Sequence, residues 1–117
     1  MRESVLLVKS KAFALEVIRV CRGLRERRCE AALIGQFLRS GTSIGANINE
    51  ANYGHSRADF ISKLHIALKE TAETEYWLRL LQMSEYINGE LSASLLQDCL
   101  EIKRILVASI NTAKSAE

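Results

Sequence analysis

The chain has no proline among its 117 residues, and this absence limits the folds that it can adopt. Proline is typical of turns and sheet edges, while inside a helix it removes a hydrogen bond and clashes with the preceding turn. Leu, Ala, Glu, Lys and Arg are abundant instead, and these residues favour helices. The composition therefore predicts long, uninterrupted helices.

Apolar residues recur at intervals of three and four in four segments, which is the spacing of an amphipathic helix. The first segment covers residues 4–28, and the second ends at residue 51. The third covers residues 56–83, and the fourth follows residue 88 with a stripe that reaches residue 113. Only short joins separate the segments, so each helix has to run antiparallel to the one before it. The sequence thus predicts an all-α, antiparallel, up-down-up-down four-helix bundle, with residues 1–117 in a single domain.

Polar residues at the expected joins indicate where the helices begin and end. Ser56 is predicted to cap the third helix and Asn88 the fourth, because a short polar side chain accepts a hydrogen bond from a free amide of the first turn. Asp59, three residues after Ser56, completes the pattern of a capping box. Gly54 is predicted to be the C′ residue after the second helix, a position that commonly adopts the left-handed conformation.

The overall composition is that of a soluble globular protein, with 48% hydrophobic and 26% charged residues. The three cysteines, Cys21, Cys29 and Cys99, are odd in number and have no CxxC spacing, so neither a disulfide framework nor a zinc site is indicated. The apolar run over residues 5–8 is too short for a signal-peptide core or a membrane span. We therefore expect a cytoplasmic protein that does not enter a membrane.

Motifs of the common enzyme classes are missing from the sequence. A di-iron bundle needs Glu-x-x-His pairs, but the residues three before His55 and His65 are Asn52 and Ser62. No glycine-rich phosphate loop, nucleophile elbow or Cys-His pairing is present. His65 is expected to be a partly buried helix residue and His55 an exposed loop residue. We predict no metal, no cofactor and no catalytic residues.

Two glycines within the second helix, Gly41 and Gly45, disfavour helix formation. A glycine inside a helix costs about 1 kcal/mol relative to alanine, so a compensating role is expected. Because the two residues lie four apart on one face of the helix, they would let another helix backbone approach closely. Close helix packing is the role predicted for them.

A polar face lies on the same helix, where Arg39, Ser43, Asn47 and Glu50 follow at intervals of four, four and three residues. Ser and Asn are poor helix formers, so a stripe that served only solvation would not need them. We predict a partly buried polar network that determines helix register or forms a subunit interface. Acidic groups of the third helix, among them Glu73, are predicted to pair with Arg39; a solvated charged face is the alternative.

Positive charge is concentrated in the first third of the chain. Residues 1–40 contain nine Lys and Arg against four Asp and Glu, a balance of +5, while residues 41–117 contain seven against ten, a balance of −3. Five arginines gather at the end of the first helix: Arg19, Arg22, Arg25, Arg27 and Arg28.

This arginine cluster has two explanations, and both stay open. Cations near a helix C-terminus are stabilised by the helix dipole, which is a purely structural reason for them. Arginine also suits bidentate contact with phosphate, which predicts a nucleic-acid-binding surface. A symmetric oligomer would multiply such a surface and strengthen binding.

The run from Arg39 to Glu50, Arg-Ser-x-x-Ser-Ile-x-x-Asn-Ile-x-Glu, and the Glu-Thr-Glu-Tyr-Trp-Leu segment at residues 73–78 closely resemble a known family. The chain is similar over nearly its whole length to the bacterial four-helix bundle proteins first noted as open reading frames within intervening sequences of 23S ribosomal RNA genes. The accessory protein of diversity-generating retroelements is similar in fold. That resemblance implies a homopentameric barrel whose basic surface binds RNA or DNA and which also binds a reverse transcriptase.

Two functions are consistent with the sequence. The first is a non-enzymatic, oligomeric accessory or scaffold protein that binds nucleic acid. The alternative is a protein–protein adaptor that binds no nucleic acid, in which the arginines are structural. Binding to purified nucleic acid at physiological salt separates the two.

Overall fold

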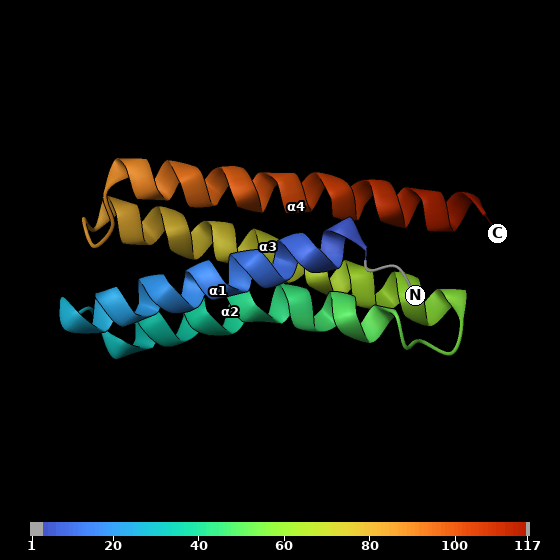
Figure 1. The fold of residues 1–117 in the computed structure, drawn as a ribbon, viewed down its shortest axis with the longest axis horizontal. Helices are drawn as coiled ribbons and strands as arrows, with labels where there is room; N and C mark the ends of the chain where they lie inside the picture. The colour runs from blue at the N-terminus through green and yellow to red at the C-terminus, as the bar shows by residue number, and fades with distance from the viewer. Residues whose placement is uncertain (1–3, 117) are drawn as a thin grey trace.

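The structure, a computed structural model, describes residues 4–116, which form four helices and no strand. The helices lie side by side along a rod with extents of 48 × 23 × 20 Å (Figure 1). The prediction of an all-α chain with four helices is therefore confirmed. The helices are α1 (Val5–Glu26), α2 (Ala31–Ala51), α3 (Arg57–Met83) and α4 (Gly89–Ser115).

The four helices form a ring in which each packs against two others. α1 contacts α2 and α4, and α3 likewise contacts α2 and α4, with the α1–α4 seam the most sparsely packed of the four. The connecting turns alternate between the two ends of the rod (Figure 1). These contacts between consecutive helices are compatible with the predicted antiparallel, up-down-up-down arrangement.

Each helix turns an apolar stripe toward the centre of the ring. Val17 of α1, Phe37 of α2 and Leu78 of α3 are completely buried, as is Leu106 of α4. Burial of such a side chain stabilises the fold by about 1.5–3 kcal/mol. Charged and polar residues dominate the outer faces, and no helix within residues 4–116 has the length and apolar character needed to cross a bilayer.

The predicted N-caps of α3 and α4 are confirmed. Ser56 Oγ accepts a hydrogen bond from the Asp59 amide at 3.1 Å, and Asn88 Oδ1 accepts one from the Leu91 amide at 2.8 Å. Each bond satisfies a backbone donor that has no partner within its own helix. Both helices therefore begin where the sequence indicates.

α1 and α3 end in left-handed turns that were not predicted from the sequence. Arg28 and Glu85, just beyond the two helices, have positive φ values of 59° and 67°. After Arg28, the Cys29 amide donates to the Leu24 carbonyl at 3.0 Å, which is the longer bond of a Schellman motif. Because neither left-handed residue is glycine, the usual signal for this ending is missing.

The prediction that Gly54 is a left-handed C′ residue is wrong. No glycine of the described residues has a positive φ, and α2 ends instead through Asn52 in a right-handed conformation. Gly54 lies against the start of α3, where a Cβ would be 3.1 Å from Asp59 Cβ and 3.3 Å from the Phe60 amide nitrogen. Close approach of neighbouring atoms, rather than a left-handed turn, explains the glycine.

Candidate interaction surfaces

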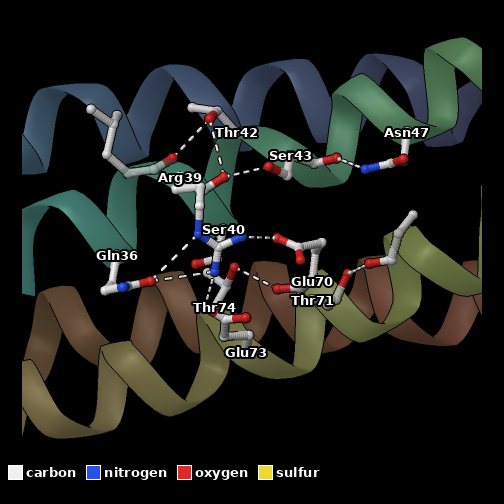
Figure 2. A network of polar contacts seen from close by, with 12 residues as sticks. Gln36, Arg39, Ser40, Thr42, Ser43, Asn47, Glu70, Thr71, Glu73 and Thr74 are labelled. Carbon is white, nitrogen blue, oxygen red and sulfur yellow. Dashed lines mark hydrogen bonds and ion pairs between the residues drawn. The ribbon is translucent and has the colours of Figure 1, made fainter.

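An ion-pair cluster on the seam between α2 and α3 surrounds Arg39 (Figure 2). The Arg39 guanidinium group donates to the Glu70 carboxylate at 2.9 Å and also to the Glu73 carboxylate. Trp77 Nε1 donates to the same Glu73 carboxylate at 3.0 Å. The side chains of Arg39, Glu70 and Glu73 are 48%, 17% and 33% exposed. Arg39 thus pairs with acidic residues of the third helix, as expected from the sequence, in a partly buried setting.

Glu73 has a pKa below the ordinary value of its carboxyl group, because it accepts hydrogen bonds from Trp77 and from Arg39. At acidic pH the unfolded chain therefore binds a proton at this position before the folded protein does. The contribution of Glu73 to stability is complete above the unfolded-state pKa, and it is lost as the pH falls through the lower, folded-state pKa.

We expect Glu73→Gln to remove part of the acid sensitivity of the fold. As the pH falls from about 6 to about 3, the wild type should lose more unfolding free energy than the variant, which has no carboxylate to protonate at this position. Urea denaturation followed by circular dichroism measures both pH profiles. Because the pair is partly exposed, the difference at neutral pH should stay below about 1 kcal/mol. Parallel profiles would contradict the prediction.

The other members of the predicted polar face do not join the Arg39 cluster. Ser43 Oγ donates to the Arg39 carbonyl at 2.6 Å, and Asn47 Nδ2 donates to the Ser43 carbonyl at 2.9 Å, so both side chains bond to their own helix (Figure 2). Glu50 forms a separate ion pair with Lys63 of α3 at 3.0 Å. The polar face therefore consists of two separate cross-helix ion-pair sites, and the side chains of Ser43 and Asn47 between them bond within α2.

Gly41 and Gly45 face α1. A Cβ built on Gly41 would lie 2.8 Å from Val17 Cγ2 and 2.9 Å from Val17 Cγ1, and one on Gly45 would lie 3.2 Å from Ser10 Oγ. The Val17 distances are far shorter than ordinary carbon–carbon contact, which is about 3.5–4.0 Å. The absence of side chains at these glycines therefore lets α1 pack closely on α2.

The five arginines at the end of α1 are all exposed, but two of them have partners. Arg19 forms an ion pair with Glu16, one turn earlier in the same helix. Arg27 donates to the backbone carbonyl of Tyr86 and, at 3.1 Å, to that of Glu85. Arg27 thereby ties the turn after α1 to the turn between α3 and α4, a structural role that the sequence did not reveal.

Arg22, Arg25 and Arg28 differ from those two arginines. Their side chains make no hydrogen bond or ion pair within residues 4–116. Arg25 lies in the last turn of α1, and Arg28 lies in the left-handed turn beyond it. The part of the predicted basic surface that is available to a ligand is therefore this set of three.

Exposed apolar side chains on α1 and α4 were not predicted from the sequence. Val5, Val8 and Leu15 of α1 are 62%, 49% and 54% exposed, and Leu100 and Val107 of α4 are 44% and 41% exposed. Their spacings of three and seven residues place them on one side of each helix. A second row of apolar residues beside the core-facing row was the sequence feature from which they could have been predicted. These side chains are candidates for contact with another molecule.

The histidines and cysteines of the described residues do not belong to a metal-binding cluster. Within residues 4–116, no three or more His, Cys, Asp and Glu side chains are placed to hold a metal ion. Both histidines are exposed, so the expectation of a partly buried His65 is wrong. The cysteines are buried and unpaired, and burial raises the pKa of each thiol, that of Cys99 to about 12. Thiols with raised pKa values are poor nucleophiles at neutral pH.

Comparison with known proteins identifies a family and a similar solved structure. The model of the family described as 23S rRNA-intervening sequence protein matches residues 2–108. The chain is also 49% identical, with a TM-score of 0.88, to a protein with unknown function from the S23 ribosomal protein family of Bacteroides thetaiotaomicron VPI-5482, and the match covers 91% of this chain and 98% of that chain. No curated protein matches. The resemblance carried by the Arg39–Glu50 run is confirmed, and this chain belongs to the 23S rRNA-intervening sequence protein family.

Proposed function

We propose that this protein is a non-enzymatic, self-assembling accessory scaffold that binds nucleic acid through Arg22, Arg25 and Arg28. The observation that carries the proposal is that these exposed side chains make no hydrogen bond or ion pair within residues 4–116. By contrast, the guanidinium groups of Arg39 and Arg79 form ion pairs with carboxylates. Three guanidinium groups at one end of α1 are thus available to phosphates.

Helix capping does not account for all three of these arginines. Arg25 alone lies in the last turn of α1, where a cation gains about 0.3–1 kcal/mol from the helix dipole. Arg22 lies one turn earlier, and Arg28 lies outside the helix. A guanidinium group forms bidentate contacts with phosphate oxygens, and a cluster of such groups attracts a polyanion in a salt-dependent manner.

Self-assembly is the second part of the proposal. One subunit with three available arginines binds nucleic acid weakly, whereas a ring of identical subunits repeats the cluster and gains avidity. Exposed apolar side chains such as Leu15 of α1 and Leu100 of α4 supply surface that assembly would bury. We propose a homopentamer that works in the cytoplasm, the oligomer implied by the resemblance to the retroelement accessory protein.

Charge reversal at Arg22 and Arg25 tests nucleic-acid binding. We expect Arg22→Glu/Arg25→Glu to weaken the binding of a fluorescent single-stranded RNA at least about tenfold at low salt. The slope of log K against log salt should also become shallower, by about 0.7 for each phosphate that the variant no longer neutralises. Fluorescence anisotropy at two salt concentrations measures both effects. Arg27 is left unchanged because it holds the turn between α3 and α4.

The matched control for this test is Lys69→Glu/Lys114→Glu. It makes the same change in net charge at exposed positions of α3 and α4, and it should bind the RNA nearly as well as the wild type. Equal binding by the wild type and the Arg22/Arg25 variant would overturn the proposal. Absence of RNA binding by the wild type at physiological salt would do so too, in favour of an adaptor for a partner protein such as a reverse transcriptase.

Light scattering tests self-assembly. We expect the wild type to have a mass near five times the 13.1 kDa of one chain. Leu15→Glu should lower that mass without loss of helicity, because it places a charge on a side chain that is 54% exposed in α1. Tyr53→Glu, at a position that is 78% exposed between α2 and α3, is the control. A monomeric wild type would rule out the pentamer. An unchanged mass for the Leu15 variant would show that this face of α1 is not part of the interface.

A further inference from the structure

A groove is open at the end of the bundle where α1 begins. Ser4 caps α1, with its Oγ accepting a hydrogen bond from the Leu7 amide at 3.0 Å, while α3 and α4 extend beyond this point (Figure 1). Elsewhere along the rod, α1 fills the position between α2 and α4. Beyond Ser4, a groove of about 1070 Å³ lies between α4 and the turn that leads from α2 into α3.

The floor of this groove is apolar. Phe60 of α3 lines it together with Ile105, Ala108 and Ala113 of α4. Phe60, Ile105 and Ala113 are partly exposed, and Ala108 is exposed. The alanines leave room above α4 for larger apolar groups of a bound segment, and covering this surface would add hydrophobic stabilisation.

The rim of the groove is positively charged. Arg57 and Arg104 are exposed there, and their side chains form no hydrogen bond or ion pair within the described residues. Glu101 is the one carboxylate among the described residues that line the groove, and Lys9 pairs with it at 2.8 Å. The hydrogen bond and charge of Lys9 and, to a smaller extent, the charge of Arg104 lower the pKa of this carboxyl. Arg57 also begins α3, where the helix dipole adds positive potential. An apolar floor is thus combined with a rim on which cationic side chains outnumber carboxylates.

We propose that this groove binds an acidic amphipathic helix of a partner protein, which packs against α4 and the turn that leads from α2 into α3. From Ile105 to Ala116, α4 offers a surface roughly 18 Å long at 1.5 Å per residue, the length of a helix of about three turns. Apolar side chains at helical spacing cover the floor, and carboxylates beside them pair with Arg57 and Arg104. This site goes beyond the nucleic-acid proposal, because it lies at the opposite end of α1 from Arg22.

The composition of the groove favours a helix over nucleic acid as the ligand. Phosphates can pair with Arg57 and Arg104, but a phosphate backbone leaves Phe60 and Ile105 uncovered. An amphipathic helix satisfies both features, since its apolar face buries the floor at about 25 cal/mol per Å² while its acidic flank reaches the rim.

Selection from a defined peptide library tests the proposal. The peptides, displayed on phage, are about 14 residues long, with Leu at intervals of three and four residues and with Glu, Lys or Ala elsewhere. Peptides selected on the wild-type protein should carry Glu in at least about fivefold excess over Lys. A synthetic peptide of the enriched sequence should bind at least about tenfold more weakly to Ala108→Trp, which fills the groove, and to Arg57→Glu/Arg104→Glu, which reverses the charge of its rim.

Arg22→Glu/Arg25→Glu is the control, because it makes the same charge change at the other end of α1 and should bind the peptide as the wild type does. Ala108, Arg57 and Arg104 are exposed, so the variants should fold, and circular dichroism checks this. Equal selection of Lys and Glu, or selection of the same peptides on Ala108→Trp, would overturn the proposal. Loss of RNA binding by Arg57→Glu/Arg104→Glu would also overturn it, since that result assigns the groove to nucleic acid.

Discussion

Phe37→Ala is expected to lower the free energy of unfolding by about 3–5 kcal/mol. Phe37 is completely buried in α2 and belongs to the same core cluster as Val17, Leu78 and Leu106. Alanine removes the ring and leaves a cavity that the close-packed neighbours fill only in part. Urea unfolding followed by circular dichroism measures the loss. One fixed protein concentration is needed, because the proposed self-assembly would make stability depend on concentration.

Tyr53→Ala is the matched control for the Phe37 variant. It also removes an aromatic ring, but from a side chain that is 78% exposed between α2 and α3. Its unfolding free energy should stay within about 0.5 kcal/mol of the wild type. If Phe37→Ala lost no more stability than this control, the centre of the bundle would not be tightly packed around the Phe37 ring.

Gly41→Ala is expected to destabilise the bundle relative to Gly35→Ala, although both lie inside α2 and gain the same helix propensity of about 1 kcal/mol. A Cβ at Gly35 meets nothing within 4 Å, whereas one at Gly41 would lie 2.8 Å from Val17 Cγ2. Val17 is completely buried, and its β-branched side chain is held in one preferred rotamer. Because overpacking of this kind costs about 1–3 kcal/mol, the two variants should differ by about that amount.

The cause of the Gly41 effect can be tested by removing the atoms that the new Cβ meets. Val17→Ala deletes both methyl groups that crowd position 41. The Val17→Ala/Gly41→Ala protein should therefore lose less stability than the sum of the two single losses, as measured by the same urea titration. Additive losses, or equal stability of the Gly35 and Gly41 variants, would show that close packing of α1 does not restrict this position.

The two proposed binding surfaces are separated along the molecule. Arg22, Arg25 and Arg28 lie at the C-terminal end of α1, and the groove with Arg57 and Arg104 lies beyond its N-terminal end. The rod is 48 Å long, so a bound nucleic acid and a bound partner helix need not compete. The two proposals together therefore predict that the protein can bind both ligands at once.

Local sequence patterns were sufficient to predict the helices. The apolar spacing predicted four segments close to those observed, and Ser56 and Asn88 predicted two helix starts, because a cap depends only on residues within one turn. The endings at Arg28 and Glu85 were missed, since arginine and glutamate carry no signal for a positive φ. The prediction for Gly54 was wrong because the space for a side chain there is limited by the start of the next helix. The residues next to Gly54 in the sequence do not reveal this contact.

The candidate surfaces depend on contacts that local patterns do not encode. Spacing placed Arg39 and Glu50 on one face of α2, but it could not show that Arg39 meets Glu70 and Glu73 while Glu50 meets Lys63. Partners on different helices depend on how far each helix is rotated and shifted against its neighbour, and these quantities are determined by packing of the core.

The absence of proline and the recurrence of apolar residues therefore determined by themselves that this chain forms four long helices, because helix propensity and periodicity act over a few residues. Tertiary structure alone decided that Arg27 binds the Tyr86 carbonyl, 59 residues away, and that Arg22, Arg25 and Arg28 have no such partner within residues 4–116. It also decided that a groove opens beyond Ser4. These features require helices distant in sequence to meet, and their relative positions emerge only when the whole core packs at once.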